Sequence, residues 1–169
     1  MYRQYYATMM PICLRYAPNE EEAAEILNDS FLKLFHLLEE PQQEAIRSLK
    51  ALIKRIVINT AIDYFRKNKK HHDTTELHSE RFEEADPVNV LHNMAAEDII
   101  EEVQRLPDTM RTVFNLCVIE GYSHKEVADA MDISEGTSRS YLAKARIKLQ
   151  KRFAAIYPQY QKGHAGKLG

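Results

Sequence analysis

Apolar residues at helical spacing constrain this fold more than any other feature. Between Leu49 and Tyr64 they recur three and four residues apart, which places them on one face of an α-helix. The other side carries Arg55, Asn59 and Arg66 in a line, with Lys50 and Lys54 beside it. We therefore expect a long helix that buries one face and presents positive charge on the other.

Further helices are predicted on both sides of this one. Upstream, Glu20, Glu21 and Glu22 would occupy a helix's first turn, where the macrodipole favours acids. The apolar face of that helix would be formed by Ala23, Leu27, Phe31, Leu34 and Leu38, and Pro41 would end it. A helical block from about residue 95 to 156 is broken at Leu106-Pro107 and Glu120-Gly121. Only 5 Gly and 6 Pro argue against a turn-rich β fold.

The domain organisation follows from length and composition. A chain of 169 residues is long for one compact unit and sufficient for two small ones. The segment 67–93 is polar, charged and rich in histidine, which is typical of a linker. We expect an all-α protein with two small helical domains, 1–70 and 95–156. A flexible acidic linker, 71–94, would join them, and 157–169 would be a disordered tail.

Charge is segregated along the chain, although the net charge is only -2. Residues 47–70 hold eight Lys and Arg against the single acid Asp63, and residues 139–152 hold six with no acid. Between these blocks, residues 71–108 hold eleven acids. Two basic blocks predict two anion-binding surfaces, whereas solvated helix faces explain either block alone but explain the pair less well.

Several classes of function are disfavoured by the sequence. Cys13 and Cys117 lie far apart with no CxxC spacing, which fits core thiols of a cytoplasmic protein. No stretch approaches a membrane span or a secretion signal. His71-His72 lacks Cys or Glu at ligand spacing, and no nucleophile, base and orienting group are clustered. We expect no metal, no cofactor and no catalysis.

The segment 123–149 has the pattern of a helix-turn-helix. Ser123 can cap a short helix, 124–131, a tight turn follows at Asp132-Ile133, and Ser134 can cap the next helix. The start of that second helix would approach base edges in the major groove, and its later cations would reach phosphates. A basic amphipathic helix without DNA is the alternative. The candidate contacts are Ser134, Glu135, Thr137, Ser138, Arg139, Tyr141, Lys144 and Arg146.

Together these motifs resemble bacterial extracytoplasmic-function (ECF) sigma factors. Residues 106–146 look like the family's fourth region, which reads promoters, in the motifs LP, GYS, EVA, DIS, GT and AR. Upstream, AAEILNDSFLKLF at 23–35 resembles the AEDLVQETFLRLW-like helix of the second region. IVINTAIDYFR at 56–66 resembles the family's IARNxAIDxxR helix. The matches cover nearly the whole chain in the family's order.

This resemblance implies specific partners. In the family, the first of these helices docks on the coiled coil of the largest core RNA polymerase subunit, and Glu25, Asn28 and Asp29 are the exposed candidates here. An ordinary acidic surface is the alternative. The fourth region contacts the flap of the second-largest subunit and the minus-thirty-five element, and many members are held by an anti-sigma factor. The residues implied in binding and melting the minus-ten element are Lys50, Lys54, Arg55, Asn59, Arg66 and Lys67.

The chain departs from the family pattern at a few positions. Leu52 stands where the family often has Trp, and it stacks poorly on a base. Where the family commonly reads TVKSR, Ser138 replaces an apolar packing residue and Tyr141 replaces a basic contact residue. Family members generally start further upstream, so we expect a shortened first helix. The loop 39–48 is placed to hold an extruded base.

Two interpretations of the linker and of the whole chain remain open. About 25 residues can span ~80 Å, enough to bridge promoter elements ~70 Å apart. The linker's acids either imitate RNA phosphates in the polymerase or are simply solvated. The sequence predicts a promoter-specific initiation factor with RNA polymerase and promoter DNA as partners. A stand-alone helix-turn-helix regulator with a sensory or dimerising N-terminal module is the alternative.

Overall fold

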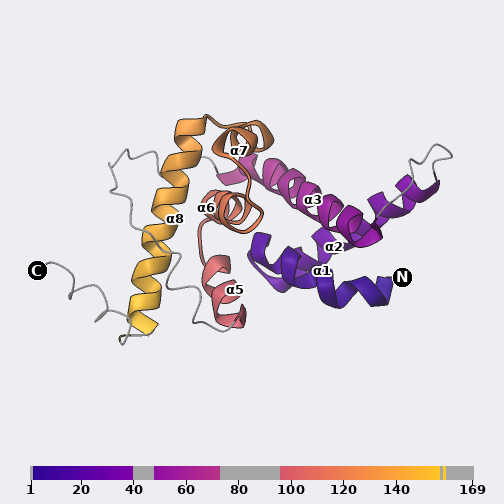
Figure 1. Ribbon diagram of the computed structural model, residues 1–169, viewed down its shortest axis with the longest axis horizontal. Coiled ribbons are helices and arrows are strands. Elements are labelled where there is room, and N and C mark those ends of the chain that lie inside the picture. Colours follow the sequence, from indigo (N-terminus) through magenta and orange to yellow (C-terminus); the bar gives the residue numbers. More distant parts are fainter. Residues whose placement is uncertain (1, 40–47, 73–95, 157, 159–169) are drawn as a thin grey trace, which may run out of the picture. The chain divides into compact units, whose positions relative to one another are not determined.

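The protein is helical throughout the part of the chain that the structure describes. The computed structural model describes residues 2–39, 48–72, 96–156 and 158, and within these residues there is no strand (Figure 1). The chain divides into two compact units, Met1–Leu77 and His78–Gly169. The expected all-α fold class is thereby confirmed.

The N-terminal unit is a bundle in which α1 (Tyr2–Tyr16), α2 (Glu20–Glu39) and α3 (Leu49–His72) all contact one another. α2 begins as predicted, because the Glu22 backbone N–H donates to Asn19 Oδ1 at 2.9 Å and the first turn is acidic. The predicted apolar faces line the core, with Leu38, Leu49, Leu52, Ile56 and Tyr64 half-buried at its edge. The side chains at the centre of this core include Met9, Cys13, Ala23, Ile26, Leu27, Phe31, Leu34, Ile53 and Val57.

Two polar contacts join α2 to α3. Lys33 Nζ lies 2.9 Å from Asp63 Oδ2, and the Tyr64 hydroxyl donates to the Glu22 carboxylate. Exposed ion pairs contribute only ~0–1 kcal/mol, so these contacts orient the helices more than they stabilise the unit. The Lys33 contact also occupies the carboxylate of Asp63, the acid within the first basic block.

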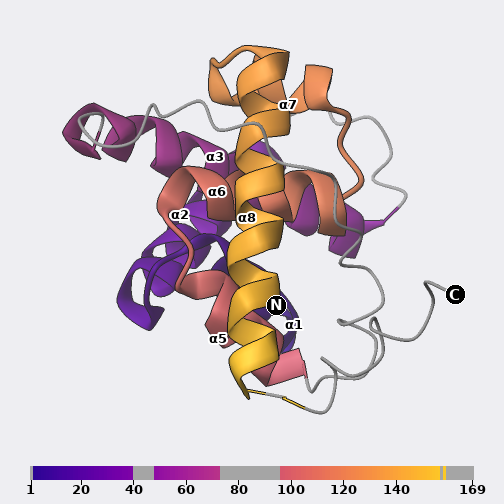
Figure 2. The same ribbon diagram turned by 90° about the vertical axis from the view of Figure 1, so that its left-hand side faces the viewer.

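The C-terminal unit is assembled around one long helix, α8 (Glu135–Ile156). Figure 2 shows α7 (His124–Met131) at one end of α8 and α5 (Ala96–Gln104) at the other, with α6 (Asp108–Phe114) between them. A π-helical turn, η1 (Asn115–Ile119), continues α6, and Gly121 then adopts a φ of 76°. Buried side chains on these helices include Val103, Leu106, Met110, Phe114, Leu116, Val127, Met131, Leu142, Ala145, Leu149 and Phe153.

A buried carboxylate ties the far end of α8 to α5. Glu102 is 3% exposed, and its oxygens lie 2.7 Å from Arg105 Nη1 and 3.4 Å from Arg152 Nη1. A buried charge has to be paired, because desolvation otherwise costs several kcal/mol. Arg152, the last cation of the second basic block, is therefore part of the packing.

Some of the expected segments lie partly or wholly outside the described residues. α3 continues to His72, two residues beyond the expected start of the linker. The remainder of that linker, the 40–47 segment of the base-holding loop and most of the tail lie outside the described residues, so those predictions remain predictions. Cys13 and Cys117 are free thiols. No helix in the described ranges is both long and apolar enough to cross a bilayer.

Candidate nucleic-acid interface

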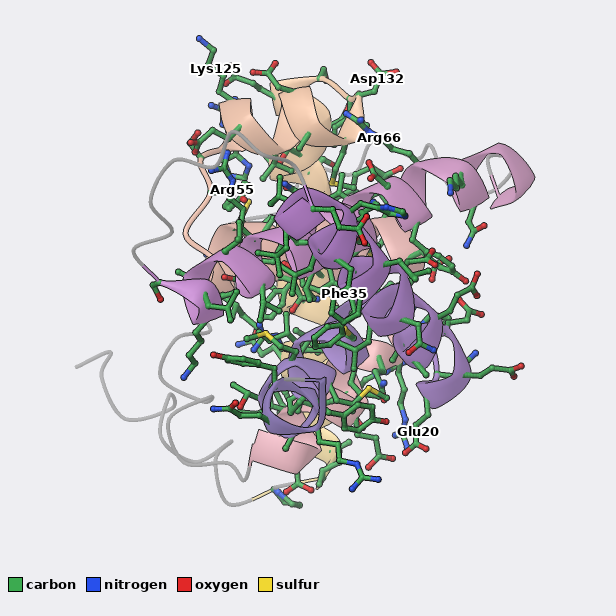
Figure 3. The ribbon with its side chains drawn as sticks, turned by 90° about the vertical axis from the view of Figure 1, so that its right-hand side faces the viewer. Glu20, Phe35, Arg55, Arg66, Lys125 and Asp132 are labelled. Carbon is green, nitrogen blue, oxygen red and sulfur yellow. The ribbon has the colours of Figure 1, made fainter. Side chains whose placement is uncertain are left out.

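The cationic face of α3 consists of Lys50, Lys54, Arg55, Asn59, Arg66 and Lys67, all of which are exposed. Arg55, Asn59 and Arg66 lie opposite the buried stripe around Val57, so burying the apolar side forces them outward, whereas Lys50 and Lys54 are exposed near the start of α3. Arg55 and Arg66 lie about three helical turns apart along α3 (Figure 3). Such a row of cations can follow the phosphates of a nucleic-acid strand. Leu52, at the edge of this face, is half-buried.

The helix-turn-helix has the boundaries and caps that the sequence predicts. Ser123 Oγ accepts the Glu126 backbone N–H, and the Glu126 side chain accepts the Ser123 backbone N–H, forming a capping box at the start of α7. Asp132 then adopts left-handed angles, φ 55° and ψ 53°. Figure 3 shows Lys125 and Asp132 pointing away from the α7 ribbon. The turn therefore leaves this end of the motif open to solvent.

The first turn of α8 is organised by its own side chains. Ser134 Oγ accepts the Thr137 backbone N–H at 3.0 Å and lies 2.8 Å from Thr137 Oγ1. Glu135 and Arg139 form an ion pair at 3.0 Å, with both side chains exposed. Because an exposed pair of this kind is weak, DNA can compete for the guanidinium. Ser134, Glu135 and Arg139 are accessible as expected, and Thr137 is half-buried.

The expectation that Ser138 contacts DNA is wrong. Ser138 is 0% exposed, and its hydroxyl lies 2.8 Å from Nδ1 of His124 on α7. Its position explains the burial, because Ser138, Leu142, Ala145 and Leu149 follow helical spacing along the inner face of α8. That spacing was available in the sequence and would have placed Ser138 in the interior.

The later predicted contacts on α8 are less accessible than its first turn. Tyr141, Lys144 and Arg146 are all half-buried. Arg146 Nε is buried, and among the described residues it has no hydrogen-bond partner. Desolvation lowers the pKa of the nearby His124, and the charges of Arg139 and Arg146 lower it further. Arg146 thus lies between the surface of the motif and the polar group of His124.

A second candidate surface lies on α2. Glu25, Asn28 and Asp29 are exposed and share one helix face. The sequence interpretation missed that Leu32 and Phe35 continue this face and are 57% and 42% exposed. Both residues fall outside the helical spacing of the buried residues at 23, 27, 31 and 34, and this spacing in the sequence could have predicted their exposure. Acids beside exposed apolar side chains are typical of a protein-binding surface.

Comparison with known proteins identifies both units. The Sigma-70 region 2 family matches residues 1–71, and the Sigma-70 region 4 family matches residues 96–149. The fold and these two matches define a sigma factor of the sigma-70 type. Within this class, the chain belongs to the ECF sigma factors, so it acts in transcription initiation with RNA polymerase and promoter DNA.

The similar proteins agree with this assignment. The chain is 23% identical over 164 residues to an ECF RNA polymerase sigma-E factor of Haemophilus influenzae, covering 90% of this chain and 85% of that protein. It is 24% identical over 159 residues to the RNA polymerase sigma-H factor of Pseudomonas aeruginosa, covering 88% and 81%. The region 2 match leaves the alternative of a stand-alone regulator less supported.

A solved structure shows the same fold. The sigma factor RpoE of Bartonella quintana, crystallised in complex with the anti-sigma factor NepR, aligns with a TM-score of 0.50 and 18% sequence identity. The alignment covers 92% of this chain and 97% of that chain.

Proposed function

We propose that the three exposed surfaces divide the work of initiation between them. The cationic face of α3 would bind the minus-ten element, the first turn of α8 would read the minus-thirty-five element, and the α2 face would dock on core polymerase. The observation that carries this proposal is the solvent exposure of each surface on a unit that matches the corresponding sigma region. The protein itself would contribute binding and no catalysis.

The role of α3 follows from the energetics of strand separation. Unstacking a base step costs a few kcal/mol, and a protein without ATP must offset that cost by binding the separated strand. Lys50, Lys54, Arg55, Arg66 and Lys67 supply cations for backbone phosphates. Asn59 sits among them and can donate to or accept from a base edge. The charge and position of this face therefore support binding of the melted minus-ten strand.

The role of α8 follows from the reach of its first turn. Glu135 can accept from a cytosine amino group and Arg139 can donate to guanine, with Ser134 and Thr137 beside them. Tyr141, Lys144 and Arg146 lie further along the helix, where side chains of a recognition helix meet phosphates. Base reading would therefore depend on the first turn, and affinity on the later residues.

The α2 face supports docking on the coiled coil of the largest polymerase subunit. Glu25, Asn28 and Asp29 can accept hydrogen bonds from arginines, and Leu32 and Phe35 add apolar area that an exposed acidic surface lacks. We also propose that the C-terminal unit contacts the flap of the second-largest subunit. Control by an anti-sigma factor belongs to the same proposal.

Reconstituted transcription tests the proposal. Purified protein and core polymerase from its host should initiate at a promoter of that host, and Glu25→Lys with Asp29→Lys should abolish the complex with core. Charge reversal places cations against the expected partner cations, while an exposed helix face tolerates the change with little loss of stability. Transcript yield and core affinity are measured together.

A graded control separates charge from shape. Glu25→Gln with Asp29→Asn keeps the side-chain size, so core affinity should fall to an intermediate value. Binding of the C-terminal unit to upstream duplex should not change in either variant. Undiminished core affinity after charge reversal would rule out the α2 face, and failure of the wild-type protein to initiate anywhere would rule out the whole proposal.

A further inference from the structure

One polar cluster joins three elements of the helix-turn-helix. His124 is the first residue of α7, and its Nδ1 lies 2.8 Å from Oγ of Ser138 in the first turn of α8. The same nitrogen lies 3.8 Å from Sγ of Cys117, which comes from the π-helical turn η1. A single imidazole nitrogen thus contacts two other elements of the motif.

The protonation states of this cluster follow from its burial. Desolvation raises the pKa of Cys117, so the thiol keeps its proton at neutral pH. Desolvation also lowers the pKa of His124, so the imidazole is neutral there. With an S–H and an O–H both beside Nδ1, the neutral ring is best satisfied with its proton on Nε2 and Nδ1 as the acceptor. We assign the Ser138 hydroxyl as the donor.

A hydrogen bond at this place constrains the helices differently from an apolar contact. The hydrophobic effect is not directional, so apolar surfaces can slide or rotate against each other with less change in energy than a hydrogen-bonded pair. A hydrogen bond weakens steeply when its distance or angle changes. A buried hydroxyl also loses free energy if its partner moves away. The His124 contact therefore favours one rotation of α8 about its axis.

That rotation matters because of what surrounds Ser138. Thr137 and Arg139 are its neighbours in the chain, and Glu135 begins the same turn. A rotation of α8 about its axis that moves Ser138 also moves these side chains relative to the base edges. Bidentate contacts to a base tolerate little displacement, since each one discriminates through its geometry.

We propose that His124 and Ser138 are positioning residues that set the orientation of α8 and so determine how strictly it discriminates minus-thirty-five sequences. Neither residue needs to touch DNA for this effect. The inference rests on the proposed reading of the upstream element by α8.

The test uses full-length protein, host core polymerase and a promoter library randomised over the upstream element. Discrimination is the ratio of transcript yield between the preferred upstream sequence and its single-base variants. Ser138→Val and His124→Phe each remove one partner, and each should reduce discrimination roughly threefold to tenfold, the range expected when one buried hydrogen bond is lost. Hydrogen exchange of α7 and α8 amides in the same proteins reports their stability.

The double variant distinguishes positioning from mere stability. Replacing both partners by apolar groups removes the imidazole and the hydroxyl together and leaves only the weakly polar Cys117 thiol, so the exchange protection of α7 and α8 should recover in His124→Phe/Ser138→Val. Discrimination should stay reduced, because the directional contact is gone. Recovery of discrimination together with stability would show a packing role only and overturn the inference.

Val103→Ala serves as the matched control. Val103 is fully buried on α5, which lies at the opposite end of α8 from α7 (Figure 2), and truncating it leaves a cavity that costs stability. This variant should lose stability without losing discrimination; an equal loss of discrimination would overturn the inference. If the wild-type protein has no preference for an upstream sequence, both the proposed reading by α8 and this inference are wrong. If both single variants keep the wild-type preference, only this inference is wrong.

Discussion

At the scale of the residue, His124 shows how one half-buried side chain can connect the elements of a motif. Its ring contacts Cys117 of η1 and Ser138 of α8, and the charged groups that affect it are Arg139, Arg146 and Glu135. Burial and the two arginines lower its pKa, and Glu135 acts in the opposite direction. The neutral imidazole is therefore the form that the folded motif favours.

This lowered pKa predicts a pH dependence of stability. The unfolded chain takes up a proton at His124 near the ordinary pKa of 6.5, before the folded protein does. The contribution of neutral His124 is therefore fully present above pH 6.5 and is lost as the pH falls from there toward the folded pKa. Hydrogen exchange of α7 and α8 amides, followed over that range, should show weaker protection at lower pH.

His124→Phe provides the comparison for this measurement. The variant lacks the titrating ring, so the difference in protection between it and the wild-type protein should change across the window below pH 6.5. Every other residue is the same in both proteins, so its contribution cancels in the difference. A difference in protection that stays constant with pH would contradict the lowered pKa of His124.

At the scale of the element, the helix ends define the motif. The capping box of Ser123 and Glu126 starts α7, left-handed Asp132 ends it, and Ser134 starts α8 three residues after α7 stops. The donations from Ser123 also hold the pKa of Glu126 below its ordinary value. Short helices depend strongly on such caps, because an eight-residue helix has little cooperativity of its own.

Removing the cap of α7 should therefore be measurable. Ser123→Ala eliminates the acceptor for the Glu126 N–H and should reduce the stability of α7 by about 1 kcal/mol. Ser123→Asp keeps a side-chain acceptor at the same position and should retain most of that stability. Hydrogen exchange of the α7 amides measures both variants, and equal protection in Ser123→Ala and wild type would refute the role of the cap.

At the scale of the whole molecule, charge distribution matters more than net charge. A formal charge of -2 hides the exposed cationic face of α3 and the cations of α8. Some of these cations are already paired, since Arg139 contacts Glu135 and Arg152 contacts Glu102. Any cation on the exposed α3 face that neutralises a phosphate should add to the salt-dependent affinity for DNA.

Salt dependence tests this distribution. If Arg55 neutralises one promoter phosphate, Arg55→Ala should reduce the slope of log affinity against log salt by about 0.7 to 0.9 in promoter complexes of the polymerase with this protein. Arg105→Ala makes the same change in net charge but removes a guanidinium that is 2.7 Å from Glu102. Its slope should equal that of the wild type. Equal slopes for all three proteins would exclude a phosphate contact by Arg55.

Local patterns in the sequence predicted several of the elements of this protein, although not the π-helical turn η1. The spacing of apolar residues predicted the buried faces of α2 and α3, and the caps at Ser123 and Ser134 predicted the bounds of α7 and the start of α8. These features depend on neighbours within one or two turns, so the local sequence contains the relevant interactions. The motifs also carried the resemblance to ECF sigma factors, which the comparisons confirmed.

Only the tertiary structure decided which partners the buried polar side chains of the candidate site have. Helical spacing places Ser138 on the inner face of α8, but the imidazole of His124, fourteen residues away, makes that position favourable for a hydroxyl. Packing likewise decided how much of Leu32 and Phe35 stays exposed, at 57% and 42%. Sequence patterns predict which face of a helix is apolar, but the partner for each buried polar atom comes from another part of the chain.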